Sequence, residues 1–258
     1  MKIREAQYSD KNIILEFCKN TFSWGDYIKD VWDYWINEGY LFVAEDQKPV
    51  GICHAFFSNT QVWIEGIRIE TSSRRKGLAS KLICHVESIA IKKEKSFAYM
   101  LIDVENTSSL SMAKNLHYAI EDTWKFYSLV PRPSENHNVK FGILGNELVP
   151  HYVKSWRWLE LDDKSLSLLS AISKIVYSKL DPDFSFMIMT DSEHFEKTLI
   201  VTLYSGSKQN TMNLISYVEN FGFKNNYERI QILTKENLPA YETLEHRISF
   251  YLMKKILV

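Results

Sequence analysis

Apolar residues follow two different spacings along the first half of the chain. Short apolar runs bounded by polar or turn-forming residues predict strands, whereas apolar residues recurring every three or four positions predict helices. Strands are expected at residues 2–6, 40–44, 50–57, 62–69 and 97–104, with further strand-like segments up to residue 129. Helices are expected after Ser9, from about Asp26, at 77–91 and at 110–116. Strands and helices that alternate in this way indicate an α/β or α+β fold.

The stretch Pro131-Arg132-Pro133-Ser134-Glu135-Asn136 interrupts this pattern. Proline and small polar residues between patterned segments predict a boundary. Beyond it, strands are expected at 154–161, 184–190, 198–204 and 229–234, with one helix at 212–218. Another helix is expected from Pro239, because Tyr241, Leu244, Ile248 and Tyr251 follow at helical spacing. A chain of 258 residues is long for a single core, so two domains are predicted, at 1–130 and 137–258.

Composition and charge narrow the classes of protein. With 45% hydrophobic and 24% charged residues, the chain has the make-up of a soluble globular protein. A net charge of -1 gives no reason to expect nucleic acid or an anionic membrane as partner. The N-terminus lacks the apolar core of a signal peptide, and no apolar run approaches about 18 residues. The cytoplasm is therefore the expected location.

The sequence has no grouped residues of the kinds that bind a metal ion. The three cysteines have no C-x-x-C spacing and are expected to be buried thiols. No H-E-x-x-H or cysteine–histidine set is present, so no metal is expected.

A basic, glycine-containing segment joins the strand that ends at Ile69 to the helix after it. It reads Arg74-Arg75-Lys76-Gly77-Leu78-Ala79. The first amides of a helix lack partners and its dipole favours negative charge, while glycine allows close approach and basic side chains add donors. The segment therefore predicts a phosphate-binding loop, and the alternative is a basic turn before an ordinary helix.

The R-x-x-G-x-A pattern of this segment resembles the pyrophosphate loop of the GNAT (GCN5-related N-acetyltransferase) family. Asn106, Ser109, Leu116 and Tyr118 also stand where that family has an asparagine, a small residue and a hydrophobic close. The resemblance covers residues 1 to about 129. It implies a GNAT-like mixed sheet flanked by helices, acetyl-CoA as co-substrate without a metal, and acetyl transfer to the primary amine of a small molecule or amino acid.

The resemblance also implies roles for individual residues. The main chain of Ile67, Arg68 and Ile69 would pair with the pantetheine arm, and Asn106 and Ser109 would lie on its far side. The pyrophosphate would be held by the loop residues Arg74, Arg75, Lys76, Gly77, Leu78, Ala79 and Ser80.

Catalysis requires a neutral amine, and hence a base that takes its proton. Glu65, on the strand expected beside the thioester, is the predicted base, and the alternative is a structurally paired carboxylate. The family often has a tyrosine acid where this chain has Ala113, and its glycine–phenylalanine close is replaced by His117-Tyr118. Tyr118 is therefore a candidate acid, as is Tyr127, and both have core packing as the alternative.

Asp26 and Tyr27, at the start of the second helix, stand where the resemblance implies the acceptor wall, and they are the candidate substrate-binding residues. Asp26 would either pair with a substrate ammonium or cap the helix, and the cap is the favoured interpretation. A weaker resemblance links Gly25-Asp26-Tyr27-Ile28 and the segments at 65–69 and 75–79 to vertebrate histidine N-acetyltransferases. It implies an α-amino acid acceptor whose carboxylate is read by Arg68 or another arginine.

The second half is similar to the family's closing strand–helix–strand order, with Phe221-Gly222-Phe223 before its last strand. We expect a degenerate acetyltransferase-like α+β half that packs against the first and closes the acceptor pocket; the alternative is an unrelated extension. Trp156-Arg157-Trp158 would line a pocket or pack against a neighbouring strand. Two further functions stay open: a non-catalytic acyl-CoA-binding regulatory module, and a protein or peptide N-acetyltransferase. A homodimer is a possible assembly.

Overall fold

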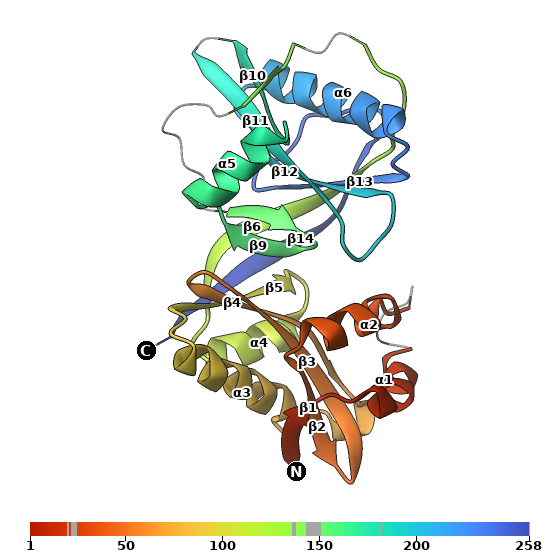
Figure 1. Ribbon diagram of the computed structural model, residues 1–258, viewed down its shortest axis with the longest axis vertical. Helices are drawn as coiled ribbons and strands as arrows, with labels where there is room; N and C mark the ends of the chain where they lie inside the picture. The colour runs from red at the N-terminus through yellow and green to blue at the C-terminus, as the bar shows by residue number, and fades with distance from the viewer. Residues whose placement is uncertain (20, 22–24, 136–137, 143–150, 181, 258) are drawn as a thin grey trace. The chain divides into compact units, whose positions relative to one another are not determined.

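The computed structural model describes residues 1–19, 21, 25–135, 138–142, 151–180 and 182–257, and the chain forms two compact units (Figure 1). Unit 1 comprises Met1–Glu121 with Leu252–Val258, and unit 2 comprises Asp122–Tyr251. The division therefore falls inside two long strands, β6 (Ala119–Leu129) and β14 (Leu244–Ile256). The proline-rich stretch proposed as a boundary lies within unit 2, and its last residue, 136, is outside the described residues.

Unit 1 is a mixed sheet in the order β1-β2-β3-β4-β5, with β14 next to β5. Its elements are β1 (Lys2–Glu5), η1 (Tyr8–Asp10), α1 (Lys11–Cys18), α2 (Ile28–Glu38), β2 (Leu41–Asp46), β3 (Lys48–Ser58), β4 (Gln61–Ile69), η2 (Thr71–Ser73), α3 (Leu78–Lys92), β5 (Phe97–Asp103) and α4 (Thr107–Asn115). All the strands and helices predicted for residues 1–129 are present.

The alternation of side chains along β2 assigns the two faces of this sheet. Leu41 and Val43 pack into one core with Trp32 and Trp35 of α2. Phe42 points the other way, where its ring meets that of His85 on α3 at 4.8 Å. Helices α1 and α2 therefore cover one face of the sheet and α3 covers the other (Figure 1).

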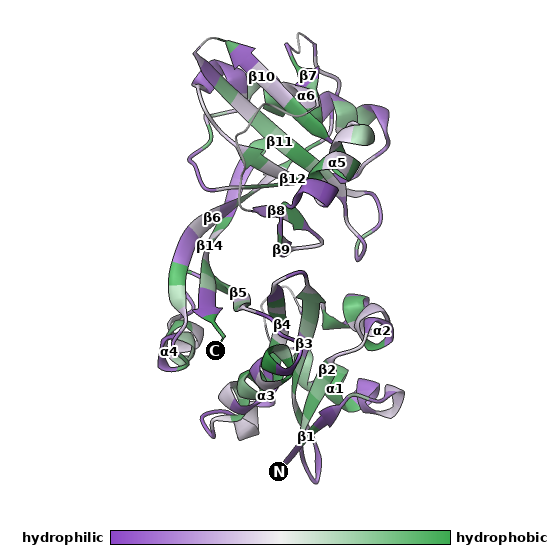
Figure 2. Ribbon diagram, turned by 60° about the vertical axis from the view of Figure 1, so that its left-hand side comes forward, coloured by the Kyte–Doolittle hydropathy of each residue, from purple (hydrophilic) through white to green (hydrophobic). Residues whose placement is uncertain are grey.

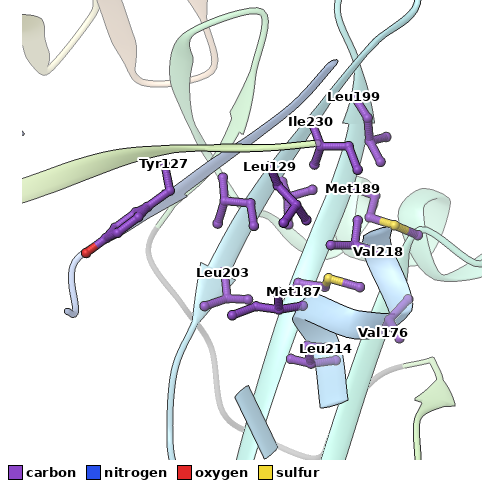
Figure 3. Packing of buried hydrophobic residues seen from close by; sticks show 13 residues of the cluster. Tyr127, Leu129, Val176, Met187, Met189, Leu199, Leu203, Leu214, Val218 and Ile230 are labelled. Atoms are coloured by element: carbon purple, nitrogen blue, oxygen red, sulfur yellow. The ribbon is translucent and has the colours of Figure 1, made fainter. Parts of the chain in front are cut away.

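In unit 2 the strands follow in the order β6-β13-β12-β11-β10-β7, and β14 next to β6 makes this order continuous with that of unit 1; β8 and β9 form a separate hairpin. The remaining elements of unit 2 are β7 (Lys140–Phe141), β8 (His151–Lys154), β9 (Arg157–Glu160), α5 (Asp163–Ala171), β10 (Ile175–Leu180), β11 (Asp183–Asp191), β12 (Thr198–Tyr204), α6 (Lys208–Lys224) and β13 (Arg229–Thr234). Hydrophobic stretches run along β11 and β12 (Figure 2). Leu214 and Val218 of α6 pack onto Met187 and Leu203 of these strands (Figure 3).

The order of elements in unit 2 repeats that of unit 1. In both, two antiparallel pairs are followed by a helix and a parallel strand: β2-β3-β4-α3-β5 in unit 1 and β10-β11-β12-α6-β13 in unit 2. This repetition matches the prediction of a second acetyltransferase-like half, and the mixed α/β class is confirmed.

Three local predictions for the second half were wrong. The strand expected at 154–161 is the hairpin of β8 and β9, because Ser155 and Trp156 both have positive φ (50° and 63°) and turn the chain. The helix expected from Pro239 is instead the long strand β14. Phe221-Gly222-Phe223 lies inside α6 rather than after it. Among the cysteines, Cys18 and Cys53 are buried as expected, but Cys84 is exposed.

Candidate active site

The basic segment forms an exposed turn that leads into α3. Gly77 precedes the helix with φ 73° and ψ 13°, in the left-handed region that glycine adopts without strain. The helix has its first main-chain bond from the Lys81 amide to the Gly77 carbonyl, at 3.0 Å. Gly77 has no side chain that could cap the earlier amides, and no side-chain cap bond is formed at this helix start. A Cβ built on Gly77 would have nothing within 4 Å.

Strands β4 and β5 pair only at their beginnings. Parallel register joins Gln61 to Phe97, Val62 to Ala98 and Trp63 to Tyr99, and no later pair is formed among the described residues. On its other side β4 stays paired with β3 as far as Ile69, opposite Gly51.

The main-chain groups of Ile67 and Ile69 lie on the edge of β4 that β5 leaves open. The Glu70 amide donates to the Val50 carbonyl of β3, at 2.8 Å. Because alternate residues of a strand direct their main-chain groups to opposite sides, those of Ile69 and Ile67 are directed away from β3. Two arginines already use this edge: Arg74 Nε donates to the Ile69 carbonyl and Arg68 Nη1 to the Ile67 carbonyl.

A β-bulge shapes β4 next to this edge. His54 lies opposite Glu65 but Ile52 lies opposite Arg68, so β4 holds one more residue than β3 over this stretch. Gly66 supplies the bulge with φ 65°, and a Cβ built there would lie 2.4 Å from the Trp35 ring. Glycine is therefore needed both for the backbone turn and for the close packing on α2.

Glu65 is bonded to a histidine that lies entirely inside the protein. His54 Nδ1 is 2.9 Å from Glu65 Oε1, and its Nε2 is 3.1 Å from the Gly39 carbonyl oxygen. Nε2 is also 3.4 Å from Glu38 Oε2. The side chain of His54 is 0% exposed and that of Glu65 is 12% exposed. Trp35 stacks on the imidazole with ring centroids 4.6 Å apart and planes 2° apart.

Asp26, Tyr27 and Arg68 form a second polar group on the same face of the sheet. Asp26 accepts from Arg68 Nε at 2.6 Å and from Arg68 Nη2 at 3.3 Å. Its Oδ1 also accepts from the Ile28 amide at 3.1 Å, so Asp26 supports the start of α2. The Arg68 guanidinium lies 5.3 Å from the centre of the Tyr27 ring. Burial raises the pKa of Tyr27 to about 12, so this phenol is protonated at neutral pH.

Asn106 and Ser109, predicted to lie on the far side of the pantetheine arm, are in contact at the start of α4. Asn106 caps that helix, with its Oδ1 accepting from the Ser109 amide at 3.1 Å. Ala113, which occupies the position of the family's tyrosine, is completely buried.

Both candidate tyrosine acids are built into packed cores. The hydroxyl of Tyr118 donates to Glu87 of α3 at 2.8 Å, and only 3% of the residue is exposed. Burial raises the pKa of Tyr118 well above its usual range. Tyr127 belongs to the core of unit 2, where its hydroxyl accepts from the Leu238 amide. These contacts favour core packing for both tyrosines. Trp156 likewise packs against Phe126, at 5.1 Å, and against a residue of β14.

Comparison with known proteins assigns the first part of the chain. Residues 10–118 match the model of the acetyltransferase (GNAT) family. This segment is a GNAT acetyltransferase domain. The comparison with curated proteins gave no match.

Solved structures share the fold of the whole chain, beyond the GNAT domain. A GCN5-related N-acetyltransferase from Sphaerobacter thermophilus is 12% identical with a TM-score of 0.65, covering 99% of this chain and 95% of its own. A proposed acetyltransferase from Thermoplasma acidophilum is 13% identical with the same TM-score of 0.65, covering 99% and 100%. A GCN5-related N-acetyltransferase from Anabaena variabilis is 11% identical with a TM-score of 0.53, covering 100% and 73%. At these identities the likeness shows the fold.

The structure of the GNAT domain brings most of the predicted residues together around β4, α3 and the start of α2. Sequence reasoning missed His54, which is bonded to Glu65, and it missed that Glu38 and Trp35 contact His54. A signal for His54 was present: the turn at 59–60 pairs Ser58 with Gln61, and that register continued along the strands places His54 opposite Glu65. The described helices include none long and apolar enough to cross a membrane. The cytoplasmic location and the homodimer stay predictions.

Proposed function

We propose that this protein is an N-acetyltransferase that moves the acetyl group of acetyl-CoA to a primary amine of a small molecule or amino acid. The observation that carries the proposal is the separation of β4 from β5 beside the glycine-led start of α3. An open strand edge and a set of helix amides then lie next to each other on one domain, as an extended, pyrophosphate-containing ligand requires.

The residues fit such a ligand. Arg74, Arg75 and Lys76 are exposed and cationic, and the absence of any atom within 4 Å of a Cβ built on Gly77 supports a close approach by a phosphate. The amides from Gly77 to Ser80 would hold the pyrophosphate. The main-chain groups of Ile67 and Ile69 would pair with the pantetheine arm, which would replace the bonds that Arg68 and Arg74 make to their carbonyls. Asn106 and Ser109 would flank the arm at the start of α4. When bound, acetyl-CoA supplies a thioester whose C–S bond is exchanged for the C–N bond of the amide.

Glu65 is the proposed base. It lies two positions after Trp63, the last residue of β4 that pairs with β5. Its side chain is 12% exposed, although the residues on either side of it in the chain are buried. In this role its carboxylate takes the ammonium proton, directly or through one water. Asp26 and Tyr27 would form the acceptor wall. Arg68 already donates to both oxygens of Asp26, so this ion pair would hold the acceptor wall in place. Arg68 could bind the carboxylate of an amino acid acceptor only by releasing Asp26.

Substitution Glu65→Gln tests the base. We expect kcat/KM to fall about 10²–10⁴-fold, the usual range for removing a general base, while the affinity for acetyl-CoA stays nearly unchanged. The acidic limb of the pH–rate profile should flatten. The measurement is steady-state kinetics on both substrates, with an amine panel that includes amino acids and peptides. A loss confined to the KM for the amine would make Glu65 a binding residue instead, and an unchanged rate would remove it from the site.

A second candidate is a regulatory module that binds acyl-CoA without turnover. It is favoured by Ala113 at the place of the family's tyrosine and by the engagement of the Tyr118 hydroxyl with Glu87. Tight binding of acetyl-CoA with no acetylated product from any amine of the panel would support this candidate over the enzyme.

A further inference from the structure

His54 is buried in the core, and it is also bonded through its ring to the proposed base. The ring lies in the core of the GNAT domain with 0% of its side chain exposed, and one face is covered by Trp35 at 4.6 Å. Yet it sits directly opposite Glu65 in the β3–β4 register, so both side chains leave the sheet on the same face. A buried imidazole is thus bonded to Glu65, the carboxylate proposed as the base.

The contacts of this ring constrain where protons reside. Nε2 faces the Gly39 carbonyl oxygen and Nδ1 faces Glu65 Oε1, and an ionised carboxylate can only accept, as a carbonyl does. A neutral imidazole carries one N–H and can donate to one of these oxygens only. The other contact is satisfied when a second proton enters between Nδ1 and Oε1, on either atom.

We propose that His54 is a positioning residue that forms a proton-sharing couple with Glu65, so that the proton taken from the acceptor amine is held between Nδ1 and Oε1. This inference rests on the proposed acetyltransfer, and it deepens the role of Glu65. The amine loses one proton, the couple gains that proton, and no other co-reactant is involved. The stack on Trp35 and the bond to Gly39 hold the ring in place while the proton is taken up.

Other charged and titratable groups surround the couple, and they do not replace it. Tyr27 lies beside α2 and Cys53 lies on β3, and burial raises the pKa of Tyr27 to about 12 and that of the Cys53 thiol above its usual range. Both therefore keep their protons over the working range of most enzymes. Arg68 and Asp26 are committed to each other as an ion pair at 2.6 Å. Glu38, at the end of α2, has its Oε2 3.4 Å from Nε2 of the ring.

Substitution His54→Asn removes proton uptake but keeps an amide that can donate to Glu65. We expect kcat to fall on the order of tenfold or more, with the Kd for acetyl-CoA within about twofold of wild type. The acidic limb of the kcat/KM profile should move to lower pH, because Glu65 alone binds a proton less tightly than the couple does. His85→Asn is the matched control: His85 lies in the same unit, on α3 across the sheet, and its loss should leave the profile unchanged.

A second measurement does not depend on turnover. The ring nitrogen signals of His54 should change when Glu65 is replaced by Gln, and should stay unchanged in the His85→Asn control. The inference would be overturned if His54→Asn had the same rate and the same pH profile as wild type. It would also be overturned if the ring nitrogen signals of His54 did not change in Glu65→Gln. If His54→Asn fails to fold, His54→Gln and the ring signals of Glu65→Gln decide. If the ring signals respond to Glu65→Gln but the wild type has no turnover, the proposed acetyltransferase activity is contradicted. If turnover is normal but the ring signals do not respond, only the proton-sharing couple is contradicted.

Discussion

At the scale of single residues, a charged contact near the N-terminus holds three elements of unit 1 together. Arg4 of β1 donates to both oxygens of Asp10, at 2.7 and 2.9 Å, and to Glu45 of β2. Asp10 also accepts from the Gln7 amide at 2.8 Å. The bonds from Arg4 hold the pKa of Asp10 below its ordinary value. This buried carboxylate therefore contributes to stability only while it is ionised.

Substitution Asp10→Asn should destabilise the protein by about 1–3 kcal/mol at pH 7, the range for a bond to a charged group. A carboxyl whose pKa is depressed by folding stabilises above its unfolded value of about 3.9, and this contribution is lost as the pH falls through the folded value. The difference from wild type should thus shrink below about pH 4. Denaturant unfolding across pH measures it. Asp33→Asn, which breaks an exposed pair with Lys11, is the control and should cost under about 1 kcal/mol. A difference that persists undiminished at low pH would contradict this assignment.

The residues of the candidate site differ in how far the sequence could predict them. Gly77 and its basic neighbours are contiguous, so their pattern was visible without a structure. The pairing of His54 with Glu65 follows from a two-residue turn and could have been read from the register. The stack of Trp35 on His54 could not, because it depends on how α2 lies across the sheet. Tertiary packing leaves no local signature in the sequence.

At the scale of elements, prediction succeeded where each segment is determined by its own pattern and failed where a distant partner decides. The strands and helices of unit 1 follow local periodicity. Tyr241, Leu244, Ile248 and Tyr251 have helical spacing, but the last three lie in β14, which is bordered in the sheet by β5 and β6, and these precede it by more than a hundred residues. Its residues Ile248, Phe250 and Tyr251 also suit a strand, and pairing prevails over the weaker helical pattern.

The bulge at Gly66 lets β4 pack closely against Trp35 of α2, and the substitution Gly66→Ala tests this contact. The new Cβ would enter the Trp35 ring, and alanine is strained at φ 65°, so we expect a loss of about 1–3 kcal/mol in unfolding free energy. Activity should fall as well, because Trp35 supports His54. The control is Gly25→Ala, which has φ 99° but nothing within 4 Å of the new Cβ. Equal losses in the two variants would show that backbone strain alone matters and that the Trp35 contact does not.

At the scale of the whole molecule, the two units repeat one order of elements, but among the described residues the features proposed to bind CoA occur in unit 1 alone. In unit 2 the parallel strands β12 and β13 stay in register over five pairs, from Thr198 with Arg229 to Thr202 with Leu233. The first turn of α6 is capped by Ser207, whose side chain accepts from the Asn210 amide. In the described part of unit 2, a closed strand edge and a capped helix give no equivalent of the place beside Gly77. We therefore expect one acetyl-CoA per chain.

Calorimetric titration with acetyl-CoA tests the central claim most directly. The wild type should bind one equivalent, and Gly77→Asp should abolish binding, because it adds a side chain and a negative charge where the pyrophosphate would lie. Gly142→Asp is the matched control: Gly142 also has positive φ, lies in unit 2, and should bind like wild type when replaced. Gly77→Asn adds similar bulk without charge and should bind more weakly than wild type but measurably. Binding of acetyl-CoA by Gly77→Asp at wild-type affinity, or two equivalents per chain, would contradict the account.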